Sequence, residues 1–116
     1  MRTMKRGEVY WCENHYAVGS EMQGIRPCVI VSNDINNENS NNVQVVMLTT
    51  GQKRWIPTHV TVLTKGRMGL ALCETVTTVT KDALGDHICN LADYEMKAID
   101  RGLKIQLSLE DYGGES

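Results

Sequence analysis

The sequence contains no phenylalanine and two prolines, and none of its apolar runs approaches the roughly 18 residues that a membrane-spanning helix requires. An apolar content of 41% with 22% charged residues is the composition of an ordinary globular protein. The basic N-terminus, Met1 to Tyr10, lacks the apolar segment and the small-residue cleavage site of a signal peptide. We therefore expect a cytoplasmic protein without a membrane segment.

The four cysteines form no Cys-x-x-Cys pair, and no histidine stands beside them at the spacing of a zinc site. We therefore predict no metal site, and no motif in the sequence indicates a cofactor. Three of the cysteines lie in apolar, strand-like runs, where a cytoplasmic cysteine behaves as a small buried apolar residue. All four are expected to be reduced and structural: Cys12, Cys28, Cys73 and Cys89.

Acidic residues are absent from positions 51–72, which carry Lys53, Arg54, Lys65 and Arg67. From Asp82 onward the balance reverses, with eight acidic residues against three basic ones. The net charge of −2 therefore hides a basic middle, and local positive potential is what phosphate binding requires. An equally simple interpretation is that the basic residues are solvated tips of hairpins.

The length of 116 residues predicts one domain, 1–116, with a single core. Runs of β-branched and apolar residues predict strands at 8–12, 28–32, 43–50, 59–63 and 70–79. The Asn-rich stretch 36–42 is typical of a polar turn.

Near the C-terminus, apolar residues recur at spacings of three and four, which predicts a helix over about 92–109 with one stripe facing the core: Met96, Ile99, Leu103 and Leu107. Gly102 within that helix indicates close packing against a neighbour, and a shorter helical turn is expected at 80–84. The expected fold class is mainly β (α+β), a small bent antiparallel sheet or barrel closed by a C-terminal helix.

A Gly-rich polar loop, 19–24, leads into Arg26-Pro27 at the mouth of the apolar strand. Pro27 pushes Arg26 toward extended backbone geometry, and the glycines allow the loop to turn with its amides available to an anion. The guanidinium offers a rigid fork of donors that suits phosphate oxygens. Taken alone, this stretch is explained as well by a solvated charge at the start of a strand.

Five pieces of the chain occur in the order and spacing of MazF/PemK-type toxins of toxin–antitoxin systems, which the sequence resembles from about Lys5 to Leu109. These pieces are Lys5-Arg6-Gly7-Glu8-Val9-Tyr10, Gly19-Ser20-Glu21 with Gly24-Ile25-Arg26-Pro27, Ser32-Asn33-Asp34-Ile35-Asn36, Leu48-Thr49, and Ile56-Pro57-Thr58-His59-Val60. The resemblance implies an SH3-like β-barrel with short helices, a homodimer, and a cognate antitoxin with a disordered acidic segment. It also implies metal-independent, sequence-selective cleavage of single-stranded RNA to 2′,3′-cyclic phosphate and 5′-hydroxyl ends.

Carried over position by position, the resemblance implies that Arg26 and Thr49 are catalytic and that Ser20 is the catalytic loop residue on the phosphate side. It further implies RNA contacts by five residues: Glu21, Asn33, Lys53, Arg54 and Glu74. Thr49 could instead be a strand-end residue that satisfies its hydroxyl locally. Glu74 could accept hydrogen bonds from base edges, orient Arg26, or be a simple exposed carboxylate.

The sequence departs from the family pattern at two positions, with Thr77 where an arginine is common and Cys73 where the plasmid-type branch has a catalytic arginine. Two other functions therefore stay open, a catalytically weak or inactive binding module and a gyrase-poisoning toxin on the related fold.

Among the remaining residues suited to RNA chemistry, we expect His59 to be structural, with His15 and His87 in surface loops. Trp11 is expected in the core, and Trp55 is expected to pack over a hairpin.

Overall fold

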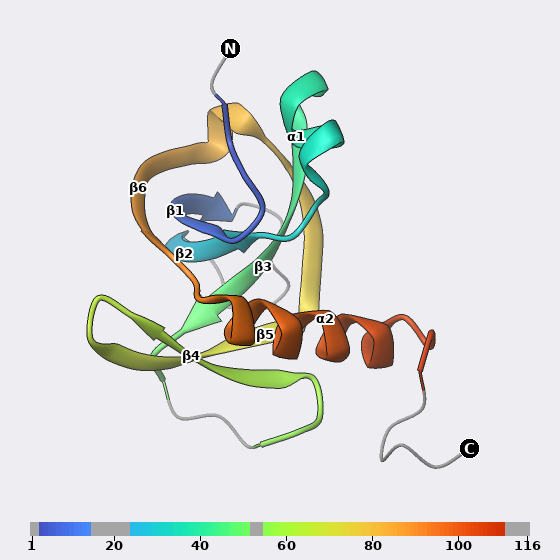
Figure 1. The fold of residues 1–116 in the computed structure, drawn as a ribbon. Helices are drawn as coiled ribbons and strands as arrows, with labels where there is room; N and C mark the ends of the chain where they lie inside the picture. Colours follow the sequence, from blue (N-terminus) through green and yellow to red (C-terminus); the bar gives the residue numbers. More distant parts are fainter. Residues whose placement is uncertain (1–2, 15–23, 52–54, 111–116) are drawn as a thin grey trace.

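Six antiparallel strands in the order β4-β5-β3-β2-β1-β6 form one curled sheet in this computed structural model, which describes residues 3–14, 24–51 and 55–110 (Figure 1). The strands are β1 (Glu8–Asn14), β2 (Gly24–Ile30), β3 (Asn42–Thr49), β4 (His59–Thr64), β5 (Arg67–Thr80) and β6 (Leu84–Asn90). The helical elements are α1 (Asp34–Asn39), the 3₁₀ turn η1 (Lys81–Ala83) and α2 (Asp93–Gln106). The mostly β fold with a C-terminal helix confirms the predicted class.

Alternation along the strands sends apolar side chains to both faces of the sheet. On one face, Val29, Val46 and Leu48 are buried together with Met96 and Ile99 of α2. On the other face, the buried residues include Cys12, Cys28, Ile30, Met47 and Leu84. Because a sheet buried on both sides needs continuous apolar runs, the short β-branched stretches of the sequence suit these central strands.

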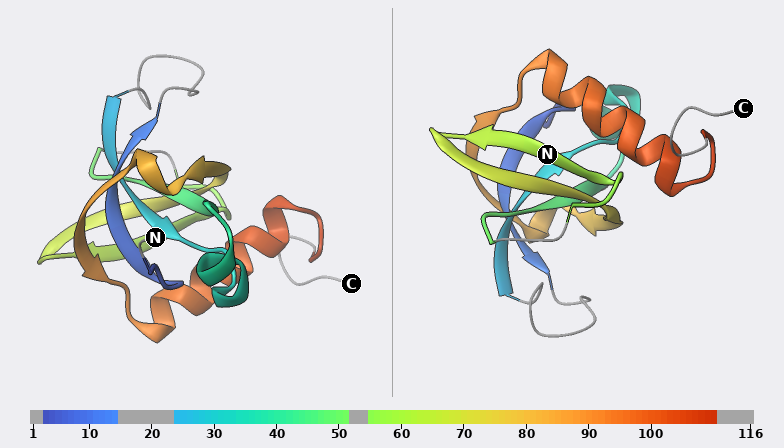
Figure 2. Two further views of the ribbon diagram at one scale, coloured as in Figure 1. Left: turned by 90° about the horizontal axis from the view of Figure 1, so that it is seen from above. Right: turned by 90° about the horizontal axis from the view of Figure 1, so that it is seen from below.

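Helix α2 lies along one side of the curled sheet in all three views (Figures 1 and 2). Glu95 fixes its start, because Oε1 accepts from the Ala92 N–H at 2.8 Å and Oε2 accepts from the Leu63 N–H of β4 at 2.7 Å. Gly102 is buried, and a Cβ built there would lie 2.6 Å from the Cys73 Sγ of β5. The close packing predicted for Gly102 is therefore with this chain's own sheet.

The helix is shorter than predicted, and Leu107 is 55% exposed beyond its last turn. Met96 and Ile99 are buried and Leu103 is partly buried, so these three residues of the predicted stripe pack within the chain and Leu107 does not. Gly102 itself packs on Val60 and Cys73, so this part of α2 faces the sheet of the same chain.

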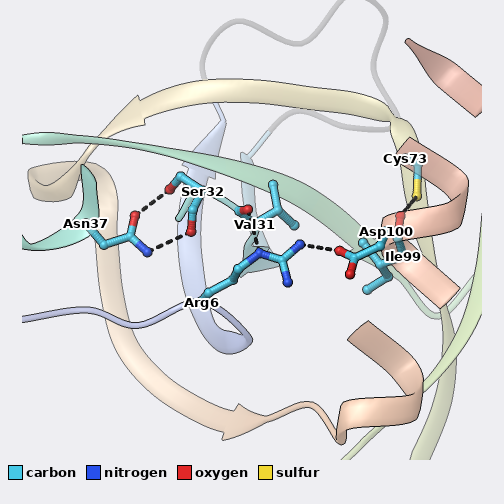
Figure 3. A network of polar contacts seen from close by, with 7 residues as sticks. All are labelled: Arg6, Val31, Ser32, Asn37, Cys73, Ile99 and Asp100. Carbon is cyan, nitrogen blue, oxygen red and sulfur yellow. Dashed lines mark hydrogen bonds and ion pairs between the residues drawn. The ribbon is translucent and has the colours of Figure 1, made fainter. Parts of the chain in front are cut away.

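Arg6 connects the N-terminal segment with α1, with α2 and with Val31, the residue that follows β2; Figure 3 shows the contacts with Val31 and with α2. Its Nε donates to the Val31 carbonyl at 2.9 Å, and its guanidinium forms an ion pair with Asp100 of α2. The Arg6 backbone N–H donates to Asp34 Oδ1 at 2.7 Å, and this hydrogen bond holds the pKa of the Asp34 carboxyl below its ordinary value. One residue thus joins three elements that are distant in sequence.

Two elements differ from the sequence-based prediction. The predicted turn at 36–42 is instead largely helix α1, held by the buried Asn37, whose amide Nδ2 donates to the Ser32 carbonyl at 2.8 Å (Figure 3). The buried Lys81 ammonium donates to the backbone carbonyl of Asn37, so tertiary contacts stabilise a helix with little apolar character. Strand β6 was not predicted, whereas the turn expected at 80–84 is present as η1.

Within the described residues, no helix is long and apolar enough to cross a membrane.

Candidate functional site

Arg26 and Thr49 occupy matching positions on neighbouring strands. Cys28 of β2 pairs with Met47 of β3, and continuing that antiparallel register by two residues sets Arg26 opposite Thr49. Side chains two residues apart in a strand lie on the same face, so both residues share the face of Cys28 and Met47. This face is opposite the one that packs on α2. The fold therefore places two residues that are 23 positions apart in the sequence at the same end of the neighbouring strands β2 and β3.

Arg26 is half-buried, and its Nε atom is shielded from solvent. It pairs with Cys12 of β1 and shares a face with Cys28, and both cysteines are fully buried. The hydrogen bond between the two thiols lowers the pKa of Cys12 and raises that of Cys28. The Arg26 side chain therefore lies beside buried apolar residues. Because less water surrounds it there, its positive charge attracts an anion more strongly than a fully solvated charge would.

Thr49 ends β3 and is partly exposed. Its Oγ1 accepts a hydrogen bond from the Gly51 N–H at 3.1 Å, the local contact considered from the sequence. A hydroxyl that accepts in this way can still donate its proton to a substrate oxygen. The Thr49 carbonyl is approached closely by Gly69 of β5, where a Cβ would lie only 2.6 Å from the carbonyl oxygen.

Glu74 lies on β5 and is held by Thr58, which precedes β4, and by His59, the first residue of β4. His59 Nε2 is 2.7 Å from Glu74 Oε2, and Thr58 Oγ1 donates to Glu74 Oε1 at 3.1 Å. The His59 side chain is 7% exposed, against 36% for Glu74. His59 therefore joins the loop before β4 to β5, in agreement with its expected structural role, and the carboxylate of Glu74 stays accessible.

Asn33 is placed away from the Arg26 end of β2. Its side chain caps α1, with Oδ1 accepting from the Asn36 N–H at 2.8 Å. Arg26 lies near the start of β2, and Asn33 follows the end of that strand. The structure gives Asn33 a helix-capping role and does not bring it next to Arg26, so its RNA contact stays a prediction.

Four sequence-predicted site residues lie outside the described residues: Ser20, Glu21, Lys53 and Arg54. His15 lies outside them as well.

Thr77, one of the two positions at which the sequence was found to depart from the pattern it resembles, lines a pocket of about 620 Å³. The polar lining consists of hydroxyls, an amide and two carboxylates, from Thr77, Thr78, Thr80, Asn42, Glu13 and Asp82. This surface is unsuited to a phosphate because its charged groups are negative. Among the described residues, no group of three or more His, Cys, Asp or Glu side chains could hold a metal ion.

The aromatic and histidine predictions were partly wrong. Trp11 is 44% exposed and not in the core, and Trp55 is 64% exposed. His87 lies in β6 and not in a loop, with Nε2 placed 2.6 Å from Asn90 Oδ1. Sequence reasoning also missed Thr58 and Gly69 as neighbours of the site. The Pro57-Thr58-His59 motif was the available signal for Thr58, whereas the proximity of Gly69 depends on strand pairing.

A family model for the PemK-like, MazF-like toxin of type II toxin–antitoxin systems matches residues 5–107. The Endoribonuclease EndoA of Bacillus subtilis (strain 168) is 38% identical over 114 residues, covering 94% of this chain and 98% of the relative. The Endoribonuclease MazF of Staphylococcus epidermidis is 34% identical, covering 94% and 95%.

Among solved structures, an endoribonuclease from a mycobacterial species in complex with its cognate antitoxin matches with a TM-score of 0.79 at 32% identity, covering 91% of this chain and 96% of that one. Together with the family match over nearly all of the chain, these similarities show that the protein belongs to the PemK-like, MazF-like toxin family of type II toxin–antitoxin systems.

Proposed function

We propose that this toxin endoribonuclease cleaves single-stranded RNA sequence-selectively and without a metal ion, leaving 2′,3′-cyclic phosphate and 5′-hydroxyl ends. The observation that supports the proposal is the antiparallel pairing of β2 with β3, because extending its register by two residues from the Cys28–Met47 pair sets Arg26 opposite Thr49 on one face of the sheet. Two relatives with 38% and 34% identity are named endoribonucleases, which supports the reaction class.

In the proposed reaction, the 2′-hydroxyl of the RNA loses its proton to solvent and attacks the adjacent phosphorus, and the bond to the 5′-oxygen breaks as that oxygen takes up a proton from solvent to become the 5′-hydroxyl. Negative charge grows on the non-bridging phosphate oxygens in the transition state. The Arg26 guanidinium and the Thr49 hydroxyl stabilise that charge by hydrogen bonds, and Ser20 adds a third donor from the loop. Because the nucleophile belongs to the substrate, the chemistry requires no metal-activated water.

The proposal includes the partners of the toxin. RNA follows a groove between two copies of the chain, with contacts from Glu21, Asn33, Lys53, Arg54 and Glu74. A cognate antitoxin places a disordered acidic segment over the same basic surface and folds as it binds. The complex of the mycobacterial relative with its cognate antitoxin supports an antitoxin as partner. We further propose that the toxin acts in the cytoplasm, where its RNA substrate is found. Sedimentation at micromolar concentration would test the homodimer.

The test is cleavage of a mixed-sequence single-stranded RNA in the presence of EDTA, with analysis of the new ends. Arg26→Ala and Thr49→Val should each lower the rate by about 10²–10³-fold, because each removes one preorganised donor. Arg101→Ala is the matched control, since Arg101 is an exposed arginine of α2 that pairs with Glu110. Circular dichroism checks that every variant is folded.

A requirement of the wild type for Mg²⁺, or products with 3′-hydroxyl ends, would contradict the mechanism. RNA binding without cleavage would identify a binding module, and inhibition of gyrase without RNA cleavage would identify the third alternative.

A further inference from the structure

The carboxylate of Glu74 is fixed at both oxygens by its own chain. Thr58 Oγ1 donates to Oε1 at 3.1 Å, and His59 Nε2 lies 2.7 Å from Oε2. A carboxylate has no proton to donate, so the facing Nε2 carries the proton of this hydrogen bond. Thr58 and His59 are buried, and the Cys73 N–H donates to the Thr58 carbonyl at 3.0 Å. The two donors therefore sit on backbone that is itself anchored to β5.

Glu74 lies within a large bulge of β5, which begins after Leu72. Val45 of β3 pairs with Thr77 of β5, and Met47 pairs with Leu72. Two positions along β3 therefore correspond to five along β5, so β5 carries three extra residues. The hydroxyl of Thr75 bridges the gap, accepting from the Met47 N–H at 2.9 Å and donating to the Leu72 carbonyl at 2.6 Å. Bulges of this kind redirect side chains next to functional sites.

Glu74 points to the same side of the sheet as the Arg26–Thr49 pair. Its carboxylate contacts His59, whose neighbour Val60 is buried in the cluster on the α2 side, so His59 and the carboxylate of Glu74 lie on the opposite side of the sheet. Leu70, the partner of Thr49, precedes Glu74 by four residues, which is at most about 13 Å along the strand because the bulge begins within this stretch. A group at that distance contacts a nucleotide beside the cleaved bond and not the reacting phosphate.

We propose that Thr58 and His59 are positioning residues that hold the carboxylate of Glu74 as an acceptor for the N–H groups of one nucleobase. The inference rests on the proposed function and deepens it by assigning a specificity-determining site. A carboxylate repels phosphate and accepts hydrogen bonds from amino and imino groups of base edges. With one lone pair of each oxygen engaged by the protein, the remaining lone pairs have a fixed direction, which favours one base over others.

The test separates base preference from catalysis. A randomised single-stranded RNA pool with 2′-O-methyl riboses cannot be cleaved by attack of a 2′-hydroxyl, so selection for binding followed by sequencing reports base preference alone. Cleavage of unmodified RNA by the same variants then gives kcat and KM. The probes are wild type, Glu74→Gln, Thr58→Val, Thr58→Ser, His59→Leu and His59→Gln.

His59→Gln places an amide donor near the position of Nε2, whereas His59→Leu fills a similar volume without a donor. We expect His59→Leu and Thr58→Val to reduce the base preference at one position by about 10-fold and to raise KM with kcat nearly unchanged. His59→Gln and Thr58→Ser retain a donor, so these variants should keep most of the wild-type base preference and a KM close to that of the wild type. Glu74→Gln should alter the preference at the same position, and adding His59→Leu to it should have little further effect.

The control is His87→Leu, since His87 is exposed in β6 and approaches Asn90 and not a carboxylate. The inference is overturned if His59→Leu keeps the wild-type preference while folded, if His59→Gln is as impaired as His59→Leu, or if the wild type shows no base preference. Failure of the wild type to cleave unmodified RNA would contradict the proposed function. The positioning role of Thr58 and His59 is tested independently, by the base preference in the binding selection with 2′-O-methyl RNA.

Discussion

At the scale of single residues, the close contact between β5 and the end of β3 requires glycine at position 69, because glycine has no side chain. Gly69 lies beside the Thr49 carbonyl, and a Cβ would be 2.6 Å from that backbone oxygen. Backbone cannot rotate away as a side-chain end can, so the strand end that carries Thr49 would have to shift. Positions of catalytic groups tolerate little displacement, since about 1 Å can cost 10²-fold in rate.

We predict that Gly69→Ala lowers the free energy of unfolding by about 1–3 kcal/mol and reduces RNA cleavage more than that loss explains. Gly85→Ala is the matched control, because a Cβ at Gly85 in β6 would meet its nearest atom, the Trp11 Cβ, at 3.5 Å, an ordinary contact. Urea unfolding and cleavage rates of the two variants provide the comparison. Equal effects of both substitutions would show that the contact at Thr49 is unimportant.

Asp34 gives a pH-dependent contribution to stability. The Arg6 backbone N–H, then the Asn37 amide, donate to its carboxylate and lower its pKa in the folded state from the ordinary value of 3.8. Stabilisation is therefore complete above the unfolded-state pKa and is lost as the pH falls through the lower folded-state pKa.

Asp34→Asn should lower the free energy of unfolding at pH 7 by less than about 1 kcal/mol, because Asp34 is exposed to solvent. The difference from wild type should shrink toward zero as the pH falls from about 4 to below the folded-state pKa. Urea unfolding at a series of pH values measures it. A difference that grows on acidification would contradict the assignment.

At the scale of elements, the site depends on how closely α2 approaches the sheet. Gly102 packs on Cys73, the residue that precedes Glu74, and a Cβ would lie 2.6 Å from its Sγ and 3.5 Å from Val60 Cγ2. Burial raises the pKa of the Cys73 thiol to about 12, so the contact involves a neutral sulfur at pH 7. The helix position is thereby coupled to the bulge that presents Glu74.

We predict that Gly102→Ala destabilises the protein by about 1 kcal/mol, since the overlap outweighs the gain in helix propensity. Adding Cys73→Ala should relieve the overlap, so that the two changes together cost less than their sum. Lys97→Ala, on the exposed face of α2, serves as the control. Thermal and urea unfolding report the outcome, and a Gly102→Ala variant more stable than wild type would contradict the packing argument.

At the scale of the whole molecule, the charge division within the sequence suggests how inhibition works. Residues 51–72 contain four basic and no acidic side chains, whereas the C-terminal third is acidic. RNA and an acidic antitoxin segment would both favour the basic side, so each would exclude the other without direct contact with Arg26.

Replacing Lys53 and Arg54 together with Ala should weaken binding of both RNA and antitoxin. The salt dependence of RNA binding should flatten by about one phosphate contact for each lost charge. Fluorescence anisotropy at several salt concentrations measures both effects, with Lys97→Ala as the control. Normal binding of both partners would show that this segment is only a solvated hairpin.

The sequence by itself determined the strands of the central sheet, because β-branched alternation and polar breaks are local properties. It also indicated Arg26 and Thr49, since the Arg-Pro pair and the strand-end threonine belong to motifs that can be recognised without the fold. The C-terminal helix was predictable from its periodicity, although its last turn was not, because Leu107 has no core to contact.

Tertiary structure alone decided the remaining features. Helix α1 forms because buried Asn37 is satisfied by Ser32 and Lys81, and β6 is an edge strand with mostly exposed residues and a weak pattern. The fixed direction of Glu74 depends on donors 15 and 16 residues away and on three extra residues in β5. Strand register and side-chain satisfaction are set by long-range pairing, and a local pattern of residues does not specify which distant groups meet.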